Sequence, residues 1–265
     1  MMRVGLLGTG RIGRLHAETI ASHSESSLYA VSDIDSESAN ELAIQYGVTV
    51  KPADDVISDP NVDAILIATS TDTHSEFIEK ASLSGKAVLC EKPVDLNLNR
   101  AKECLDKVST ANNSIMIGFN RRFDPNFAQL KKSLDNGEIG NRELLTITSF
   151  DPAPPPISYI KTSGGLYRDM MIHDFDLSNF IMGELPISIS AVGHSLVDPA
   201  IGVAGDVDTA VVTMSYADGK IAVIKNSRRA AYGMIKELKY WALKVYCKPK
   251  ILQKIVWLSR QLLAF

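Results

Sequence analysis

Cysteine is scarce in this sequence: only Cys90, Cys104 and Cys247 occur among its 265 residues. Their positions give neither the paired spacing of a zinc site nor the framework of a disulfide-bonded secreted domain. The five histidines also lack ligand spacing, and we predict no metal site. The few, unpaired cysteines are typical of a protein in a reducing compartment, and we therefore expect a cytoplasmic protein.

An excess of positive charge and long apolar runs are also missing. Lys and Arg number 28 and Asp and Glu 31, which leaves a formal charge of -3 and gives no basic field for nucleic acid. No run of about 18 uncharged apolar residues occurs, and the first residues lack the pattern of a signal peptide. We expect neither a nucleic-acid partner nor a membrane partner, and the length favours two domains.

A glycine-rich turn follows the first apolar run. "RVGLLG" leads into "GTGRIG" and then into the helical pattern "RLHAETIASH". In a dinucleotide-binding turn, Gly8 permits the tight bend, Gly10 lets the backbone approach a pyrophosphate, and Gly13 lets the helix pack closely on the strand. The N-terminus of the helix then receives the negative charge.

An acidic residue supports this interpretation. The next apolar run, "SLYAVSDID", reaches Asp33 at the spacing where dinucleotide folds place the carboxylate that binds the adenosine ribose. No arginine follows to accept an extra phosphate, which favours NAD over NADP. We interpret Asp35 as the solvated start of the next helix.

Strand and helix patterns then alternate, with "VDAILIAT", "KAVLCEKP" and "SIMIGF" as the strands. Such βαβ patterning predicts an α/β fold whose first domain, residues 1–120, is a doubly wound parallel sheet. Ligands of these folds gather at the carboxyl ends of the strands. Lys92 ends one strand before Pro93, and from local pattern alone a proton donor and an ordinary surface lysine are equally good interpretations.

The second half contains β-rich runs, among them "RELLTITSF", "ISISAVGHSLV", "VDTAVVTMSY" and "KIAVIKN". The Asp-Gly pair in "ADGK" predicts a hairpin between the last two. We expect a mostly antiparallel open sheet, covered by a helix over "GGLYRDMMIHDFD", after a stiff connection at "DPAPPP".

Asp169 and His173 lie four residues apart in this predicted helix, so they share one face. The pair is either a catalytic acid-base couple or an ordinary polar edge, and the pattern alone favours the ordinary edge. Asp174 and Asp176 add carboxylates, but a helix turns Asp174 to another side.

Several segments in order resemble the inositol dehydrogenases of the glucose-fructose oxidoreductase/inositol dehydrogenase/MocA-like family. These segments are "GTGRIGRLHAE", "ATSTDTHSEF", "EKPVDL", "GFNRRFDPNF", "SGGLYRDMMIHDFD", "LVDPAIGVAGDVDTA" and "NSRRAAYG". The resemblance implies an N-terminal Rossmann domain and a C-terminal α/β domain, residues 121–233, whose open sheet builds a tetramer. It also implies oxidation of myo-inositol, or of a related inositol or sugar, to the ketone with NAD as cofactor.

The resemblance assigns roles to individual residues. The catalytic residues fall on Lys92, Asp169 and His173, and a cis bond before Pro93 is expected. Substrate contacts fall on Asn120, Arg121, Lys161 and Tyr232, together with Asp169 and His173. Cofactor contacts fall on Gly8, Gly10, Arg11, Ile12, Gly13, Asp33, Thr69, Ser70, Thr71, His74, Glu91 and Lys92.

After Gly233 the resemblance stops in the sequence, and residues 234–265 carry seven basic residues and one Glu. This segment reads as an aberrant basic tail that leaves the C-terminal domain incomplete. Reading a back-translation one base out of frame restores the strand and turn that the family has here, which suggests a frameshift near residue 234. The alternative is a basic amphipathic helix over "KILQKIVWLSRQLLAF" that binds an anionic membrane or a partner. A damaged end would favour a non-catalytic NAD-binding remnant, and would place the tetramer in doubt.

Overall fold

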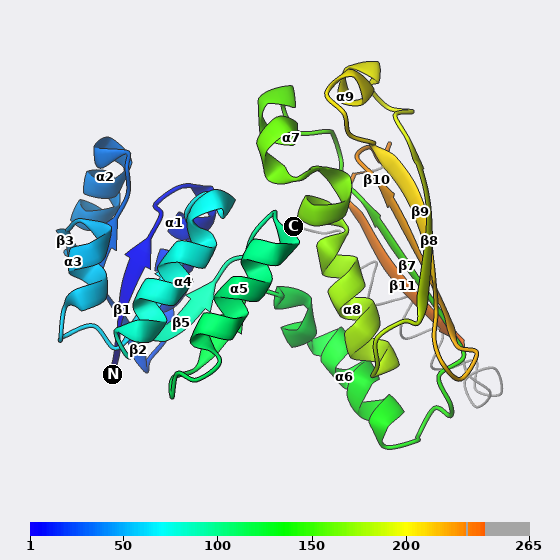
Figure 1. Cartoon of the computed structure of the whole chain (residues 1–265), viewed down its shortest axis with the longest axis horizontal. Coiled ribbons are helices and arrows are strands. Elements are labelled where there is room, and N and C mark those ends of the chain that lie inside the picture. The colour runs from blue at the N-terminus through cyan, green and yellow to red at the C-terminus, as the bar shows by residue number, and fades with distance from the viewer. Residues whose placement is uncertain (232, 242–265) are drawn as a thin grey trace. The chain divides into compact units, whose positions relative to one another are not determined.

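The computed structural model describes residues 1–231 and 233–241, which form two compact units (Figure 1). The first unit comprises Met1–Gly118 and the second begins at Phe119, close to the boundary predicted after residue 120. No described helix is long and apolar enough to cross a membrane.

Sheet A of the first unit has six strands in the order β3-β2-β1-β4-β5-β6. All its neighbouring strands run parallel, which confirms the predicted doubly wound sheet. Its strands are β1 (Met2–Leu7), β2 (Ser26–Ser32), β3 (Thr49–Val50), β4 (Ala64–Ile67), β5 (Ala87–Cys90) and β6 (Ile115–Ile117).

Helices cover both faces of sheet A. Leu6 and Leu7 point to opposite faces of β1, and both are fully buried, in two different apolar clusters. The covering elements are α1 (Arg11–Ser22), α2 (Ser36–Tyr46), α3 (Ala53–Ser58), α4 (His74–Leu83) and α5 (Leu98–Val108), with a short 3-10 turn, η1 (Thr71–Thr73), before α4. Asp35 accepts hydrogen bonds from the backbone of Glu37 and Ser38, so it caps α2 as expected.

Sheet B of the second unit has the order β11-β7-β10-β9-β8 and is mostly antiparallel, as predicted; β7 and β10 are its parallel pair. Its strands are β7 (Leu144–Phe150), β8 (Ser188–His194), β9 (Thr209–Ser215), β10 (Ile221–Ser227) and β11 (Ile235–Trp241). The Asp-Gly turn joins β9 to β10, so the predicted hairpin is confirmed.

One face of sheet B packs against helices (Figure 1). Leu177 and Ile181 of α8 (Ile172–Met182) share an apolar core with Ile147, Val212 and Ile224 of the sheet. The other helical elements are η2 (Asn120–Phe123), α6 (Pro125–Asp135), α7 (Ile157–Ser163), the π-helical turn η3 (Leu166–Met170) and α9 (Pro199–Val203).

The segment that the sequence sets apart as a tail begins with an ordinary strand. β11 pairs with β7 from Ile235 opposite Phe150 to Trp241 opposite Leu144. Leu238 and Tyr240 are buried in the core of the second unit, and the Tyr240 hydroxyl donates to the carbonyl of Asn141 at 3.0 Å. The predicted amphipathic helix lies outside the described residues.

Candidate active site

The glycine turn after β1 depends on two positions without side chains. Gly8 has a φ of 95°, and a Cβ there would lie 2.4 Å from the carbonyl oxygen of Ala68. A Cβ on Gly13 would lie 2.0 Å from the carbonyl oxygen of Gly8. α1 can therefore start directly against the turn only because both residues are glycine.

Gly10 differs from these two glycines because a Cβ there would meet no atom within 4 Å. It is the N-cap of α1 and has no side chain to cap the helix. The space beside Gly10 is therefore open at the first turn of α1, which begins with Arg11 and Ile12, and a helix N-terminus favours an anionic group there.

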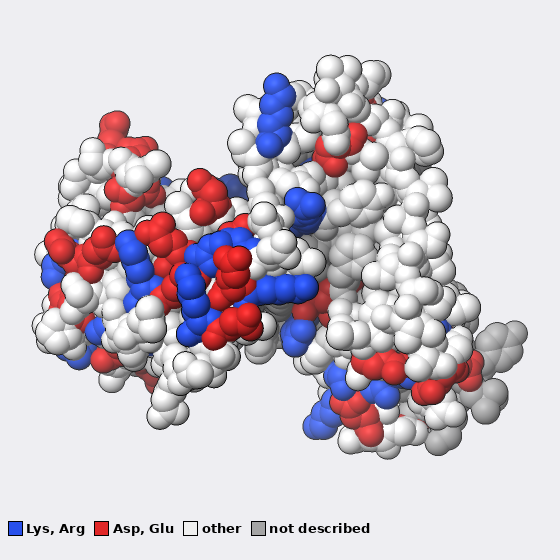
Figure 2. Space-filling model, in the orientation of Figure 1, with Lys and Arg blue, Asp and Glu red and all other residues white. Residues whose placement is uncertain are grey.

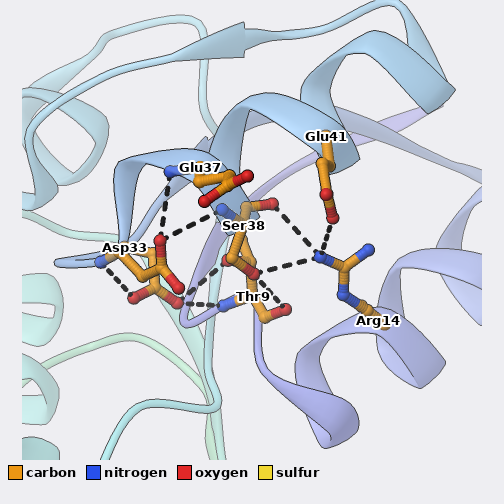
Figure 3. A network of polar contacts seen from close by, with 7 residues as sticks. Thr9, Arg14, Asp33, Glu37, Ser38 and Glu41 are labelled. Atoms are coloured by element: carbon orange, nitrogen blue, oxygen red, sulfur yellow. Dashed lines mark hydrogen bonds and ion pairs between the residues drawn. The ribbon is translucent and has the colours of Figure 1, made fainter.

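Asp33 connects the end of β2 to the glycine turn (Figure 3). Its Oδ2 accepts hydrogen bonds from the backbone amide of Thr9 at 2.5 Å and from the Thr9 hydroxyl at 2.9 Å. Its Oδ1 accepts one from the amide of Asp35 at 2.9 Å. Burial works to raise the pKa of Asp33, but these hydrogen bonds outweigh it and hold the pKa below its ordinary value of 3.8.

The same network continues to α1 and α2. Ser38 Oγ accepts from the Thr9 hydroxyl at 2.9 Å and from Arg14 Nη2 at 3.1 Å, and Arg14 also pairs with Glu41. Ile34, next to Asp33, is fully exposed although it is apolar. Sequence reasoning did not single out Thr9 or Ile34; an apolar residue directly after the predicted ribose-binding acid was the available signal for Ile34.

The loop after β4 carries the predicted contacts Thr69, Ser70 and Thr71. The hydroxyls of Thr69 and Thr73 are 2.7 Å apart, and the Thr73 hydroxyl donates to the carbonyl of Ser70 at 2.8 Å. His74, another predicted cofactor contact, begins α4 and is buried, with Nδ1 2.7 Å from the carbonyl oxygen of Pro93 and Nε2 3.1 Å from that of Thr69. Its imidazole therefore links the loops that follow β4 and β5.

Glu91 and Lys92 follow β5. Glu91 Oε1 lies 2.8 Å from Nε2 of His16 on α1, and its Oε2 accepts from the backbone amide of Lys92 at 3.3 Å. Burial works to raise the pKa of Glu91, but the hydrogen bond to His16 leads the contributions that hold it below the ordinary value. The Lys92-Pro93 bond is cis, as expected from the resemblance.

In the second unit, Asp169 and His173 do not lie on one regular α-helix. Asp169 belongs to the π-helical turn η3, where the amide of Met171 donates to the carbonyl of Leu166 at 2.9 Å. His173 lies in the first turn of α8 and is half-buried. The predicted single α-helix is therefore wrong at this point, because the bond spans five residues instead of four.

Side chains from other elements hold the Asp169 carboxylate. The Tyr159 hydroxyl of α7 donates to Oδ1 at 3.0 Å, and the guanidinium of Arg228 lies 3.6 Å from Oδ2. Arg228 follows β10 and is almost fully buried. Sequence reasoning did not single out Tyr159 or Arg228, because only the fold brings them to Asp169.

Arg121, a predicted substrate contact, is tied to a buried carboxylate. Its Nη1 pairs with Asp174 Oδ1, which also accepts from the Ser149 hydroxyl at 2.8 Å; Asn226 donates to Oδ2 at 2.8 Å. Asp174 is fully buried and turned toward sheet B, so it acts as the anchor of this network. Among the described residues, no group of three acidic, cysteine or histidine side chains could hold a metal ion.

The remaining predicted residues are less constrained. Asn120 is exposed in η2 beside Arg121, Lys161 is exposed at the end of α7, and Tyr232 lies outside the described residues.

Asp151, which sequence reasoning missed, follows β7. Burial, with Asp169 nearby, raises the pKa of Asp151 against the opposing effect of Lys236 and Arg228. An acid at the end of a strand, before a proline run, was the signal for it.

Two family models match this chain. One, an oxidoreductase family with an NAD-binding Rossmann fold, matches residues 2–119, and the other, a GFO/IDH/MocA C-terminal domain, matches residues 127–248. The chain belongs to the GFO/IDH/MocA oxidoreductase family. The second match extends past Gly233, where we expected the resemblance to end.

Named relatives of this GFO/IDH/MocA oxidoreductase share much of its sequence. Inositol 2-dehydrogenase of Rhizobium meliloti is 48% identical over 232 residues, which cover 88% of this chain and 70% of the relative. Myo-inositol 2-dehydrogenase of Thermotoga maritima is 46% identical over 245 residues, which cover 92% of this chain and 73% of the relative.

Solved structures agree with this assignment. A myo-inositol dehydrogenase from Corynebacterium glutamicum matches with a TM-score of 0.88 at 38% identity, over 92% of this chain and 73% of that one. A scyllo-inositol dehydrogenase from Lactobacillus casei was solved with NAD(H) and scyllo-inositol. It matches with a TM-score of 0.83 at 29% identity, over 92% of this chain and 74% of that one.

The first unit of this GFO/IDH/MocA oxidoreductase fits the NAD of its family. The open side of Gly10 leaves room for a pyrophosphate at the N-terminus of α1. The ionised Asp33 at the end of β2 suits two ribose hydroxyls, because a carboxylate accepts hydrogen bonds and repels an additional phosphate.

Proposed function

We propose that this oxidoreductase oxidises a ring polyol with NAD, and that myo-inositol, giving the corresponding inosose, is its substrate. The observation that carries the proposal is the fixed carboxylate of Asp169, held from two sides at the turn that leads into His173. The names of two inositol dehydrogenases that are 48% and 46% identical to it, over 232 and 245 aligned residues, support the choice of substrate.

In this proposal His173 takes the proton of the reacting hydroxyl, because an imidazole works as a base near neutral pH. Asp169 orients the imidazole and stabilises its positive charge. Lys92 donates a hydrogen bond to the reacting oxygen as the C=O bond forms. Bound NAD would supply the acceptor for the hydride from the carbon that bears this hydroxyl, so the CH–OH group loses one hydride and one proton, which is a two-electron oxidation.

The proposed cofactor contacts divide into two kinds. We assign direct contact to the glycine turn, to Asp33, to the loop Thr69–Thr71 and to Glu91 and Lys92. His74 uses both ring nitrogens on main-chain carbonyl oxygens, so we assign it the role of holding the two loops in place.

For the substrate we propose contacts from Asn120, Arg121, Lys161 and Tyr232. Arg121 would present the guanidinium N–H groups that Asp174 leaves available, since an arginine carries five donors. A polyol offers hydroxyl acceptors to such donors in several stereochemical patterns, so related inositols are alternative substrates.

A polyol panel tests the proposal. The chain is assayed with myo-inositol, scyllo-inositol and glucose, each with NAD+ and with NADP+, and kcat/KM is compared. We expect the highest value with myo-inositol and NAD+. A higher value with another polyol would move the substrate assignment to it, and NAD binding without turnover of any would support the non-catalytic alternative.

We also propose self-association through the face of sheet B that the described helices leave open. Val211 and Ile221 are exposed there, although their neighbours Ala210, Val212 and Ala222 are buried on the other face. Few charged side chains are visible over β8 and β9, whereas charges gather near the end of α6 (Figure 2). We expect a tetramer by native mass spectrometry that Val211→Asp dissociates; a wild-type monomer would contradict this.

A further inference from the structure

Arg228 is a buried cation between two carboxylates. Its exposed fraction is 1%, and its Nη2 lies 3.6 Å from Asp169 Oδ2 and 3.9 Å from Asp206 Oδ2. Asp206 binds the first residue of the π-helical turn η3, and Asp169 lies near the other end of the same turn. Arg228 therefore connects the end of β10 to both ends of the turn that carries Asp169.

Asp206 fixes the first end of η3. Both of its carboxylate oxygens accept from the backbone amide of Leu166 at 3.0 Å. The approach requires a glycine, because a Cβ on Gly165 would lie 2.5 Å from Asp206 Oδ1, and Gly165 has a φ of 77°. The position of this end of the turn therefore depends on the carboxylate of Asp206 and on glycine at position 165.

Asp169, at the second end, is held from two directions. Tyr159 donates to one carboxylate oxygen, and Arg228 faces the other. A carboxylate with both oxygens engaged by separate elements has little rotational freedom. Such fixation suits a group whose task is to orient a neighbouring base, since small displacements of catalytic groups reduce turnover strongly.

The surroundings of Arg228 do not suit a residue whose only role is to stabilise the fold. Within the described part of the chain, its Nε and Nη2 atoms have no hydrogen-bond partner, although both are buried. Removing a guanidinium from water is costly, and buried polar groups left without hydrogen bonds are uncommon. A buried ion pair is often no more stable than an apolar replacement of similar size.

We propose that Arg228 is a positioning residue that fixes the Asp169 carboxylate for catalysis. It acts through Asp169 and needs no contact with substrate or cofactor. This role rests on the proposed function, because it requires Asp169 to orient the base. The rival role is a clamp that only stabilises the fold of η3.

A double-mutant cycle separates the two roles. Arg228→Met, Asp169→Asn and the double variant are compared with the wild-type chain in kcat, in KM for myo-inositol and in Kd for NAD+. We expect Arg228→Met to lower kcat by about 10- to 100-fold and to leave both other constants within about threefold. The double variant should be no slower than Asp169→Asn, because the two residues act as one unit.

The controls make each outcome decisive. Arg142→Met removes another arginine-carboxylate pair of the second unit, with Asp135, and should leave kcat unchanged. If Arg228→Met does not fold, the cycle is run with Arg228→Lys, which keeps the charge but cannot span both carboxylates. An unchanged kcat in Arg228→Met would overturn the proposed role of Arg228 without affecting the proposed function. The same conclusion would follow if the decrease in kcat of the double variant were the product of the decreases in the two single variants. A wild-type chain that binds NAD+ but turns over no polyol would overturn the proposed function and this role together.

Discussion

Nε2 of His16 lies 2.8 Å from Oε1 of Glu91, so the helix that follows the glycine turn is joined to the residue before Lys92. Both side chains are partly buried, and the Glu91 carboxylate also accepts a hydrogen bond from the backbone amide of Lys92. The pair thus links the predicted pyrophosphate site to the predicted catalytic lysine through contacts within one unit.

Replacing Glu91 with Gln should lower the free energy of unfolding by about 1 kcal/mol at pH 7, the typical value of such a hydrogen bond. Because the pKa of Glu91 is lowered from 4.5 in the folded protein, this contribution is complete above pH 4.5. It disappears as the pH falls through the lowered pKa. Urea unfolding at several pH values checks this, and a gap between wild type and variant that widens in acid would contradict it.

Two glycines of the same turn should respond differently to alanine. Gly13→Ala should cost about 2 kcal/mol or more, because the new Cβ would lie 2.0 Å from a carbonyl oxygen. Gly10→Ala should cost less than about 1 kcal/mol and yet raise the Kd for NAD+, because its Cβ points into the space left for the pyrophosphate. Thermal unfolding and calorimetric titration measure both effects. Unimpaired NAD+ binding by Gly10→Ala would place the cofactor elsewhere.

Asp33 should determine the choice of cofactor. Asp33→Ser loses a charged acceptor for the ribose, so kcat/KM for NAD+ should fall by about 10- to 100-fold, while the ratio of NADP+ to NAD+ use rises. Asp35→Ser is the matched control, because serine still caps α2 and Asp35 has no assigned cofactor contact. Equal effects of the two substitutions would remove Asp33 from the cofactor site.

The contribution of Asp33 should not change between pH 8 and pH 5. Its pKa lies below 3.8, so the carboxylate stays ionised throughout this range. The ratio of Kd values for NAD+ between Asp33→Asn and the wild-type chain should therefore be constant there, and should shrink only as the pH falls through the lowered pKa. A ratio that already falls at pH 6 would contradict this.

Local patterns in the sequence were enough to predict the first unit. Alternating apolar runs and helical patterns specify a parallel sheet. Backbone geometry requires glycine at Gly8 and Gly13, and Asp33 binds the backbone of the same turn. The cap at Asp35 and the hairpin between β9 and β10 are likewise local features. The cis bond before Pro93 was expected from the resemblance alone.

Contacts between distant segments could not be predicted in this way. The burial of Arg228 beside Asp169 requires β10 to lie parallel to β7, a pairing that no local pattern encodes. The π-helical turn depends on Asp206 and on Gly165, about 40 residues apart. β11 lies within residues 234–265, which the sequence analysis set apart by their basic composition. In this strand the buried Leu238 and Tyr240 alternate with charged residues, a strand pattern that the composition of the whole segment concealed.

NADH formation by the purified 265-residue chain with myo-inositol and NAD+, compared with its His173→Ala variant, tests the central claim most directly. We predict turnover by the wild-type chain and a loss of about two to four decades in the variant, with NAD+ affinity unchanged. Equal turnover by the two chains would contradict the assignment of His173 as the base, and a folded, NAD+-binding wild-type chain without activity would contradict the proposed function.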